Sequence, residues 1–494
     1  MSTRSAPSDR LKAPFAAALL VLGFATLYAF TAQRGVSWGD SGLFQLRILS
    51  NDLQGDAGLA LAHPLYVATA HLLARLMPAS AQLWFLNALS GFWGALAVGA
   101  AFACAWRLTR SLRAAALAAL SLGGAHMFWW LSTMSEVYTL SVLLLACETY
   151  CLLTAVQERR PWPAVAALLA NGVHFSVHNF ALLSLPVDLA ALGWLAWREP
   201  AGRRGGVLLL AVAAGMAAWL AGALPILTLA ADRHQEMGSL WETVQDVLVG
   251  RYGAAVAGRM EVPIRVTLFN YALAGMSFAL PCLLPALRAF RHFRPSRTMR
   301  PETVLLAVLL LVHFLFWVRY RVADQATFLL PTLFLALMLA ARPLATARRP
   351  RLLAVATLLA SVFVPAAAVT LLDTHAGALL RQRGPLPFRD DLRYFALPWK
   401  HNETSAARFA SAARRELPTG ALLYVDSTTM PPLAVARRQG HLPATIRLSS
   451  EPPGPFPPSS RWEVRPFGDY RISPPEATVV RRGTFYEVTP TGRR

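Results

Sequence analysis

Long apolar runs separated by short polar segments follow one another along most of the chain. A helix of about 20 residues spans the hydrocarbon core of a bilayer, and many of these runs approach or exceed that length. The segments expected to cross the membrane are 14–32, 84–106, 114–131, 136–156, 161–176, 178–197, 206–230, 264–288, 302–318, 325–341 and 352–372. The pattern predicts an all-α polytopic membrane protein with about eleven transmembrane helices, which form a domain over residues 1–374.

The pattern changes in the tail, residues 375–494, which is richer in Pro, Arg and Thr and has no long apolar run. Helices are expected over 403–416, with Asn402 as N-cap, and over 431–439. Strands are expected over 421–425, 444–448 and 480–488, and a Pro-rich loop over 450–460. We expect a small α/β domain that follows the membrane domain.

The first polar loop, residues 33–83, is unusually long. Within it, residues 64–77 form a short apolar stretch that is too short to span a bilayer comfortably. We expect an amphipathic helix that lies at the membrane surface.

Basic residues alternate with the apolar runs in a way that fixes the expected orientation. With the N-terminus in the cytoplasm, every basic cluster falls on the inner side, as the positive-inside rule requires. The clusters lie in segments 107–113, 159–160, 198–204, 288–300 and 342–351. The odd number of spans then puts the tail outside the cytoplasm. Arg4, Arg10 and Lys12 precede a first run long enough to be an uncleaved span rather than a cleaved leader.

Composition agrees with a membrane protein, because 55% of residues are hydrophobic and only 15% are charged, with a mean hydropathy of +0.41. The net charge of +20 comes from the short loops, so no basic surface for nucleic acid is expected. The four cysteines fall in apolar segments, which argues against a disulfide framework. The Ala- and Arg-rich composition without an organelle signal is typical of a bacterial inner membrane protein.

The segment Ser37–Gly42 places Asp40 in a Gly39–Gly42 turn just past the outer end of the first span. Its carboxylate is either the N-cap of a polar loop or a functional group: a general base or a metal ligand. A general base is required where an acceptor hydroxyl loses its proton as it attacks a sugar carbon. The neighbouring Ser41 is a candidate substrate-binding residue.

Two further motifs lie at the same outer surface. His63 precedes Pro64 at the expected start of the surface helix, where it either binds a phosphate or hydroxyl or is a solvated cap. Glu136 and Tyr138 lie at the outer end of a span, where an ionisable residue indicates function unless it only interacts with the helix dipole.

His174 and His178 are four residues apart and would share a helix face if both lie on one helix. They are then possible ligands of a metal ion, although no third ligand is evident and hydrogen bonds between helices are the alternative. Arg319, Arg321 and Asp324 lie in a short outer loop. These arginines either bind a lipid-linked phosphate or extend to the lipid head groups.

Four of these five motifs converge on one membrane face, which describes a site where a lipid-borne anionic substrate meets an acceptor outside the cytoplasm. The motifs Val36–Gly42, His63–Tyr66, Asn87–Ser90 and Ser135–Tyr138 resemble those of the GT-C membrane glycosyltransferases. The most similar subgroup is a bacterial family of unknown function related to the animal O-mannosyltransferase that modifies plexin-type receptors. Further similarity lies in Gly250–Tyr252, which includes Arg251, in Tyr320–Asp324 and in Leu417–Ala421.

This resemblance implies a polyprenyl-phosphate-linked sugar as donor, with mannose as one candidate sugar, and an inverting transfer with Asp40 as catalytic base. It implies substrate-binding roles for Ser41, His63, Glu136, Tyr138, His178, Arg251, Arg319, Arg321 and Asp324. No cofactor is indicated, and the acceptor is a protein, a lipid or a polymer. The sequence departs from the family pattern at Leu43, where the family has Glu, and at Leu65 in the His-Pro-Pro-Gly stretch.

Two other classes of function remain open. A transporter or lipid flippase would carry ionisable residues near the bilayer midplane and inverted repeats, and we expect neither here. A non-enzymatic cell-envelope assembly protein would use its outer domain to bind a partner.

Overall fold

The fold is that of a computed structural model, which describes residues 7–258, 260–285, 288, 299–375, 386–450, 461–463 and 478–489. Seven of the described helices are long and apolar enough to cross a membrane, the sixth when counted from Gln325. These helices are α1 (Pro7–Thr31), α4 (Gln82–Thr109), α7 (Tyr138–Glu158), α10 (Ala201–Met237), α15 (Pro301–Arg319), α16 (Leu330–Ala345) and α17 (Pro350–His375). The chain is a multi-pass membrane protein.

Each of the other four expected spans coincides with shorter helices. The segment 114–131 is divided at Ala125 into α5 (Leu112–Gly124) and α6 (His126–Leu131). The pair 161–176 and 178–197 forms two separate helices, α8 (Trp162–Phe175) and α9 (Ala181–Trp197). The segment 264–288 contains α13 (Ile264–Phe278) and the short η3 (Pro281–Leu283).

Helix burial separates a central group from a peripheral group. Most of the apolar windows of α4, α7 and α16 are buried, whereas those of α1, α10 and α17 expose large apolar side chains, as expected for lipid contact. Small residues allow close crossing of α8 and α10. A Cβ on Gly172 would lie 2.2 Å from the carbonyl oxygen of Trp219, so this crossing requires glycine.

Several segments between the long helices carry short helices instead of irregular chain. The expected surface helix is α3 (Pro64–Ala74). The segment at 39–42, expected as a turn in a loop, is instead the first turn of α2 (Gly39–Ser50). Other short elements are η1 (Leu59–Leu61), α11 (Leu240–Leu248), η2 (Gly250–Tyr252), α12 (Gly253–Val256) and η4 (Gln325–Leu329).

The expected α/β unit follows the membrane helices, and we call the described residues 386–450, 461–463 and 478–489 the C-terminal unit. Its helices are α19 (Asp391–Ala396), α20 (Ser405–Glu416) and α21 (Met430–Arg438). Its strands are β1 (Leu422–Tyr424), β2 (Arg447–Ser449), β3 (Arg461–Glu463), β4 (Thr478–Arg482) and β5 (Phe485–Thr489). The sheet order is β2-β1-β3-β5-β4, with β1 parallel to β2 and β3, and β5 antiparallel to β3 and β4.

Three tail predictions differ in detail. Thr404 and not Asn402 is the residue before α20. The single strand expected over 480–488 is a hairpin, because Gly483 adopts a left-handed φ of 63° and turns the chain between β4 and β5. The strand expected over 444–448 is β2, shifted toward the C-terminus. The Pro-rich segment 451–460 lies outside the described residues.

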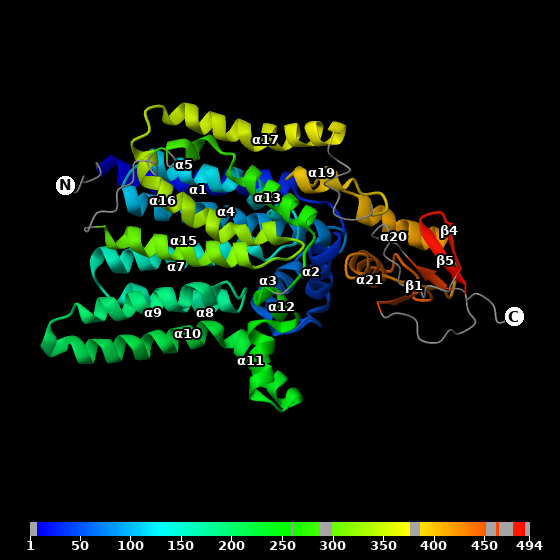
Figure 1. The fold of residues 1–494 in the computed structure, drawn as a ribbon, viewed down its shortest axis with the longest axis horizontal. Coiled ribbons are helices and arrows are strands. Elements are labelled where there is room, and N and C mark those ends of the chain that lie inside the picture. Colours follow the sequence, from blue (N-terminus) through cyan, green and yellow to red (C-terminus); the bar gives the residue numbers. More distant parts are fainter. Residues whose placement is uncertain are drawn as a thin grey trace.

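The C-terminal unit and helix α2 lie at the same end of the helical bundle (Figure 1). Helix α1 begins at the opposite end and finishes near α2 (Figure 1). The motifs that the sequence assigns to one membrane face therefore share one end of the bundle with the C-terminal unit.

Candidate active site

Asp40 is the second residue of α2 and is exposed. A carboxylate in the first turn of a helix is stabilised by the helix dipole. Trp38 is the N-cap residue in extended conformation, and Gly39 has a φ of 55°, which directs the chain into the helix. Asp40 is thus presented to solvent by a defined helix start.

Asn87 on α4 fixes the segment before this helix. Its amide nitrogen donates to the carbonyl oxygens of Gln33, at 3.0 Å, and Gly35, at 2.9 Å. Its Oδ1 accepts from Gln45 Nε2 and from the backbone nitrogen of Ser135, both at 3.0 Å. Since Asn87 is fully buried, this side chain joins α2, α4 and the segment before α7 in one rigid polar core.

Glu136 lies in that same segment, directly before α7, and is 6% exposed. Ser90 on α4 holds its backbone, since Ser90 Oγ donates to the Glu136 carbonyl and accepts from its nitrogen. The Ser41 hydroxyl donates to Glu136 Oε1 in a short hydrogen bond. The first turn of α2 therefore lies directly against the Glu136 carboxyl group.

The pKa of Glu136 is raised to about 8, mainly by burial; the Ser41 hydrogen bond lowers the pKa, and the charges of Asp40 and Asp324 raise it. Glu136 is therefore mostly protonated at neutral pH. The site combines exposed carboxylates with a buried carboxyl group that is neutral. An exposed carboxylate can accept a proton, whereas the protonated Glu136 cannot.

Tyr138 and Asp324 border the same site. The ring of Tyr138 lies 5.4 Å from the ring of His178 and 5.5 Å from that of Phe328. Asp324 is exposed and precedes η4. The structure thus brings Asp40, Ser41, Glu136, Tyr138 and Asp324 together from α2, α7 and η4.

Arg251 supplies a positive charge to this group. Its guanidinium lies 5.2 Å from the ring centre of Tyr252. Burial raises the pKa of Tyr252; Arg251 lowers it, and Asp40 and Asp324 raise it. The charges of Arg251, Asp40 and Asp324 therefore all act on the Tyr252 hydroxyl. Sequence reasoning did not select Tyr252, although it lies beside Arg251 in a matched motif.

Arg319 and Arg321 are exposed at the C-terminal end of α15. Arg319 Nη2 donates to the Ala257 carbonyl at 2.8 Å, and its guanidinium packs against Gly258, whose φ is 67°. Arg319 therefore joins α15 to the α12 loop, and Arg321 remains at the rim near Asp324.

His63 is buried and not a solvated cap. It has a left-handed φ of 50°, its Nδ1 lies 2.7 Å from the Val177 carbonyl oxygen, and its ring stacks on His178 at 5.2 Å. Its pKa is lowered to about 4, mainly by burial and also by the charge of Arg47, whereas the contact with the Val177 carbonyl raises it. His63 is thus neutral at pH 7, which suits it to hydrogen bonding rather than to charge pairing with a phosphate.

His174 and His178 do not share a helix, because α8 ends at Phe175. His174 Nε2 lies 2.6 Å from Ser141 Oγ on α7, a contact between helices. Within the described part of the chain, no group of three or more His, Cys, Asp or Glu is placed to hold a metal ion.

Arg47 on α2 is a structural residue that sequence reasoning missed. It is buried and donates to the carbonyl oxygens of Leu53, Leu61 and Ala62 at 2.6 to 3.1 Å. These bonds satisfy the backbone of the outer loop. An arginine inside the apolar stretch 43–49 was the available signal.

Comparison with known proteins by sequence finds no matching family and no matching curated protein. Comparison by structure finds ArnT from Cupriavidus metallidurans bound to undecaprenyl phosphate, with a TM-score of 0.58, 15% sequence identity, and coverage of 95% of this chain and 97% of that chain. The apo form of ArnT matches with a TM-score of 0.51, 16% identity and the same coverage. The chain therefore has the same type of fold as ArnT over nearly its whole length.

Proposed function

We propose that this protein is a membrane glycosyltransferase that moves a sugar from a polyprenyl-phosphate donor to an acceptor hydroxyl outside the cytoplasm. The observation that carries the proposal is the convergence of Asp40, Glu136, Asp324 and Arg251 at one end of the bundle. The match to ArnT bound to undecaprenyl phosphate supports a polyprenyl-phosphate donor. The subgroup resemblance in the motifs supports mannose as the first sugar to test.

In the proposed reaction, Asp40 accepts the proton of the acceptor hydroxyl while the oxygen of that hydroxyl forms a bond to the anomeric carbon. The bond between that carbon and the phosphate oxygen breaks, and polyprenyl phosphate leaves with the bonding electrons. In-line attack inverts the anomeric centre. The negative charge that develops on the leaving phosphate is stabilised by Arg251, with Arg319 and Arg321 at the rim.

The neighbouring residues have supporting roles in this proposal. Glu136 stays protonated at neutral pH, so it adds no negative charge beside the donor phosphate. Ser41, Tyr138, His63 and His178 line the substrate site as neutral hydrogen-bonding or stacking groups. The site faces the extracytoplasmic side of a bacterial inner membrane, and the C-terminal unit lies on that side.

A donor screen tests the proposal. Purified protein is incubated with defined polyprenyl-phosphate sugars and an acceptor mixture, and mass spectrometry detects released polyprenyl phosphate. Release is expected for one donor and is expected to be lost in Asp40→Asn. Equal release by Asp40→Asn would exclude Asp40 as the base.

One observation favours a second candidate, a transporter or flippase. From the sequence we expected no ionisable residues near the membrane midplane, and this expectation is wrong. Glu148, at the middle of α7, and Asp188, at the middle of α9, are both fully buried. Flux of a lipid-linked sugar across liposomes without any sugar transfer would support this alternative.

A further inference from the structure

The C-terminal unit contacts helix α2 along its whole length. At the start of the helix, the Gly39 nitrogen donates to the Thr428 carbonyl at 3.1 Å. In its first turn, a Cβ on Gly42 would lie 2.9 Å from Pro431 Cβ and 2.2 Å from the Ser37 carbonyl oxygen, so only glycine fits. At its end, Arg438 Nη2 donates to the Leu49 carbonyl at 2.7 Å.

Trp38 makes the most specific of these contacts. Its indole Nε1 donates to Ser405 Oγ at 2.7 Å, and its ring lies 5.1 Å from the ring of Phe409 on α20. The side chain is 3% exposed, so the indole nitrogen depends on Ser405 for its hydrogen bond. Trp38 therefore ties the N-cap of α2 to the first turn of α20.

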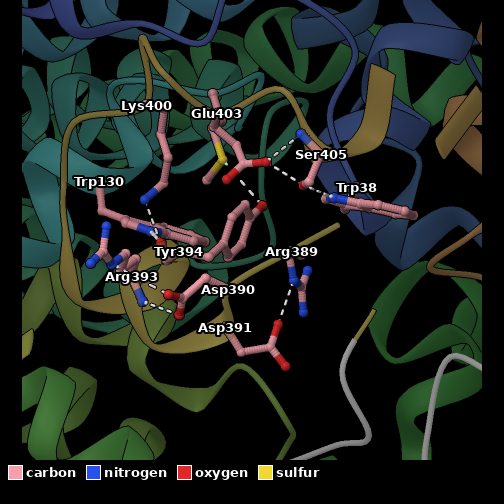
Figure 2. Close-up of polar contacts among 11 residues, drawn as sticks. Trp38, Trp130, Arg389, Asp390, Asp391, Arg393, Tyr394, Lys400, Glu403 and Ser405 are labelled. Carbon is pink, nitrogen blue, oxygen red and sulfur yellow. Dashed lines mark hydrogen bonds and ion pairs between the residues drawn. The ribbon is translucent and has the colours of Figure 1, made fainter. Parts of the chain in front are cut away.

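Ser405 is itself held in place (Figure 2). Its backbone nitrogen donates to Glu403 Oε1 at 2.8 Å, and its hydroxyl donates to the same oxygen. The hydroxyl hydrogen thus points to Glu403, which leaves the oxygen lone pairs for Trp38. The three side chains form a directed chain from indole to hydroxyl to carboxylate.

The segment that carries Glu403 is anchored to the membrane helices by Lys400. The backbone nitrogen of Lys400 donates to the carbonyl oxygen of Thr31, at the end of α1, at 2.7 Å. Its Nζ donates to the carbonyl oxygens of Tyr394 and Leu397 and lies 5.5 Å from the ring centre of Trp130 (Figure 2). The anchor is therefore buried in the junction between the bundle and the C-terminal unit.

The Thr428 side of the contact is equally constrained. Asp426 Oδ1 accepts from the backbone nitrogens of Thr428, at 3.1 Å, and Thr429, at 2.9 Å. These hydrogen bonds in the turn before α21 orient the Thr428 carbonyl toward Gly39. Two separate segments of the C-terminal unit therefore hydrogen-bond to Trp38 and Gly39, the two residues that precede Asp40.

We propose that Trp38 and Ser405 are positioning residues, through which the C-terminal unit sets the location of Asp40 relative to the bound donor. Asp40 lies two residues after Trp38, so a rotation of the first turn of α2 moves its carboxylate directly. Misplacement of a reacting group by about 1 Å costs on the order of a hundredfold in rate. This inference rests on the proposed function of Asp40.

The test compares Trp38→Phe and Ser405→Ala with wild type in the full-length protein. Trp38→Phe keeps a ring against Phe409 but removes the N–H donor, and Ser405→Thr keeps the hydroxyl. Trp84→Phe is the matched control, because Trp84 Nε1 donates to the Ala29 carbonyl of α1 at 3.3 Å and not to the C-terminal unit. Each variant is assayed for kcat, donor KM and amide hydrogen exchange in the first turn of α2.

The expected result for Trp38→Phe and Ser405→Ala is a fall in kcat of about tenfold, with donor KM within about twofold of wild type and faster exchange in the first turn of α2. Ser405→Thr is expected to restore kcat, and Trp84→Phe to match wild type. If Asp40→Asn abolishes transfer but Trp38→Phe and Ser405→Ala keep wild-type kcat, the inference is wrong and the proposed function stands. If Asp40→Asn keeps activity, both are wrong. An equal fall in Trp84→Phe would assign the effect to general loss of folding and overturn the inference.

Discussion

Two acidic groups of this protein differ in what surrounds them. At the end of the bundle next to the C-terminal unit, the exposed carboxylates of Asp40 and Asp324 flank the buried Glu136, with Ser41 and Arg251 nearby. Inside the bundle, Glu148 and Asp188 are both fully buried, and α7, α8 and α9 contain no Lys or Arg. The first group has solvent and an arginine beside it, whereas the second has neither solvent nor a Lys or Arg on these helices.

The inner pair is enclosed by helices and by polar side chains of α8. Asn171 Nδ2 lies 3.3 Å from Glu148 Oε2, and His174 Nδ1 lies 3.9 Å from the same oxygen. A buried and enclosed pair suits a packed, static site, whereas exposed carboxylates beside a cation suit chemistry with a charged substrate.

Among the variants that distinguish the two acidic groups, Asp40→Asn is expected to have the largest effect on sugar transfer. The amide cannot accept the acceptor proton, so sugar transfer is expected to fall by about a thousandfold. Release of polyprenyl phosphate measures the loss, and thermal unfolding checks that the fold persists. Asp56→Asn, which changes another exposed carboxylate of the first outer loop, is the control and is expected to keep wild-type activity.

The second effect concerns Glu136, whose folded-state pKa of about 8 exceeds its ordinary value of 4.5. Between these values the folded protein binds more protons than the unfolded chain, so this group's contribution to stability is lost as pH rises from 4.5 through 8. Transfer by wild type is expected to fall above pH 8, as ionised Glu136 adds charge beside Asp40. Glu136→Gln is expected to keep activity at pH 7 within a few-fold and to remove that fall.

The pH–rate profile between pH 5 and 9 tests the expected fall in transfer, and the melting temperature over the same range tests the expected loss of stability. The reverse result, a Gln variant that is inactive at pH 7, would mean that Glu136 itself accepts a proton. The roles of Asp40 and Glu136 would then have to be exchanged.

The smallest expected effect is that of Asp188→Asn. The amide has the shape of the carboxyl group and cannot carry its negative charge, so the free energy of unfolding is expected to change by no more than about 1 kcal/mol. Transfer activity is expected to stay within twofold of wild type. A large loss of transfer, or of flux in liposomes, would show that the inner pair serves function and would remove the contrast between the two acidic groups.

The contrast also explains what the sequence could predict. Asp40 and Glu136 lie at the ends of apolar runs, where a polar residue interrupts a visible pattern. Glu148 and Asp188 lie inside runs, and nothing in either run shows that α7 brings one against the other. All eleven expected spans correspond to helices because the apolar pattern is local, whereas pairing of acids from two helices depends on tertiary packing.

Helix α2 was missed for a similar reason. Its first turn, Gly39–Gly42, has two glycines, which disfavour a helix, and its stability comes from Asn87, Glu136 and the C-terminal unit. The buried state of Arg47 and His63 follows from the same packing. Local sequence patterns identified the residues of the candidate site but not the contacts that hold them.

The burial of Lys400 has a consequence for chemical labelling of the protein. Lys12 and Lys400 are the only lysines of the chain, and Lys400 is 2% exposed in the junction below the C-terminal unit. An amine-reactive reagent applied to the native protein should therefore modify Lys12, which is exposed, but spare Lys400. Labelling of Lys400 would then measure how often the C-terminal unit separates from the bundle, and the chain carries its own chemical reporter of that separation.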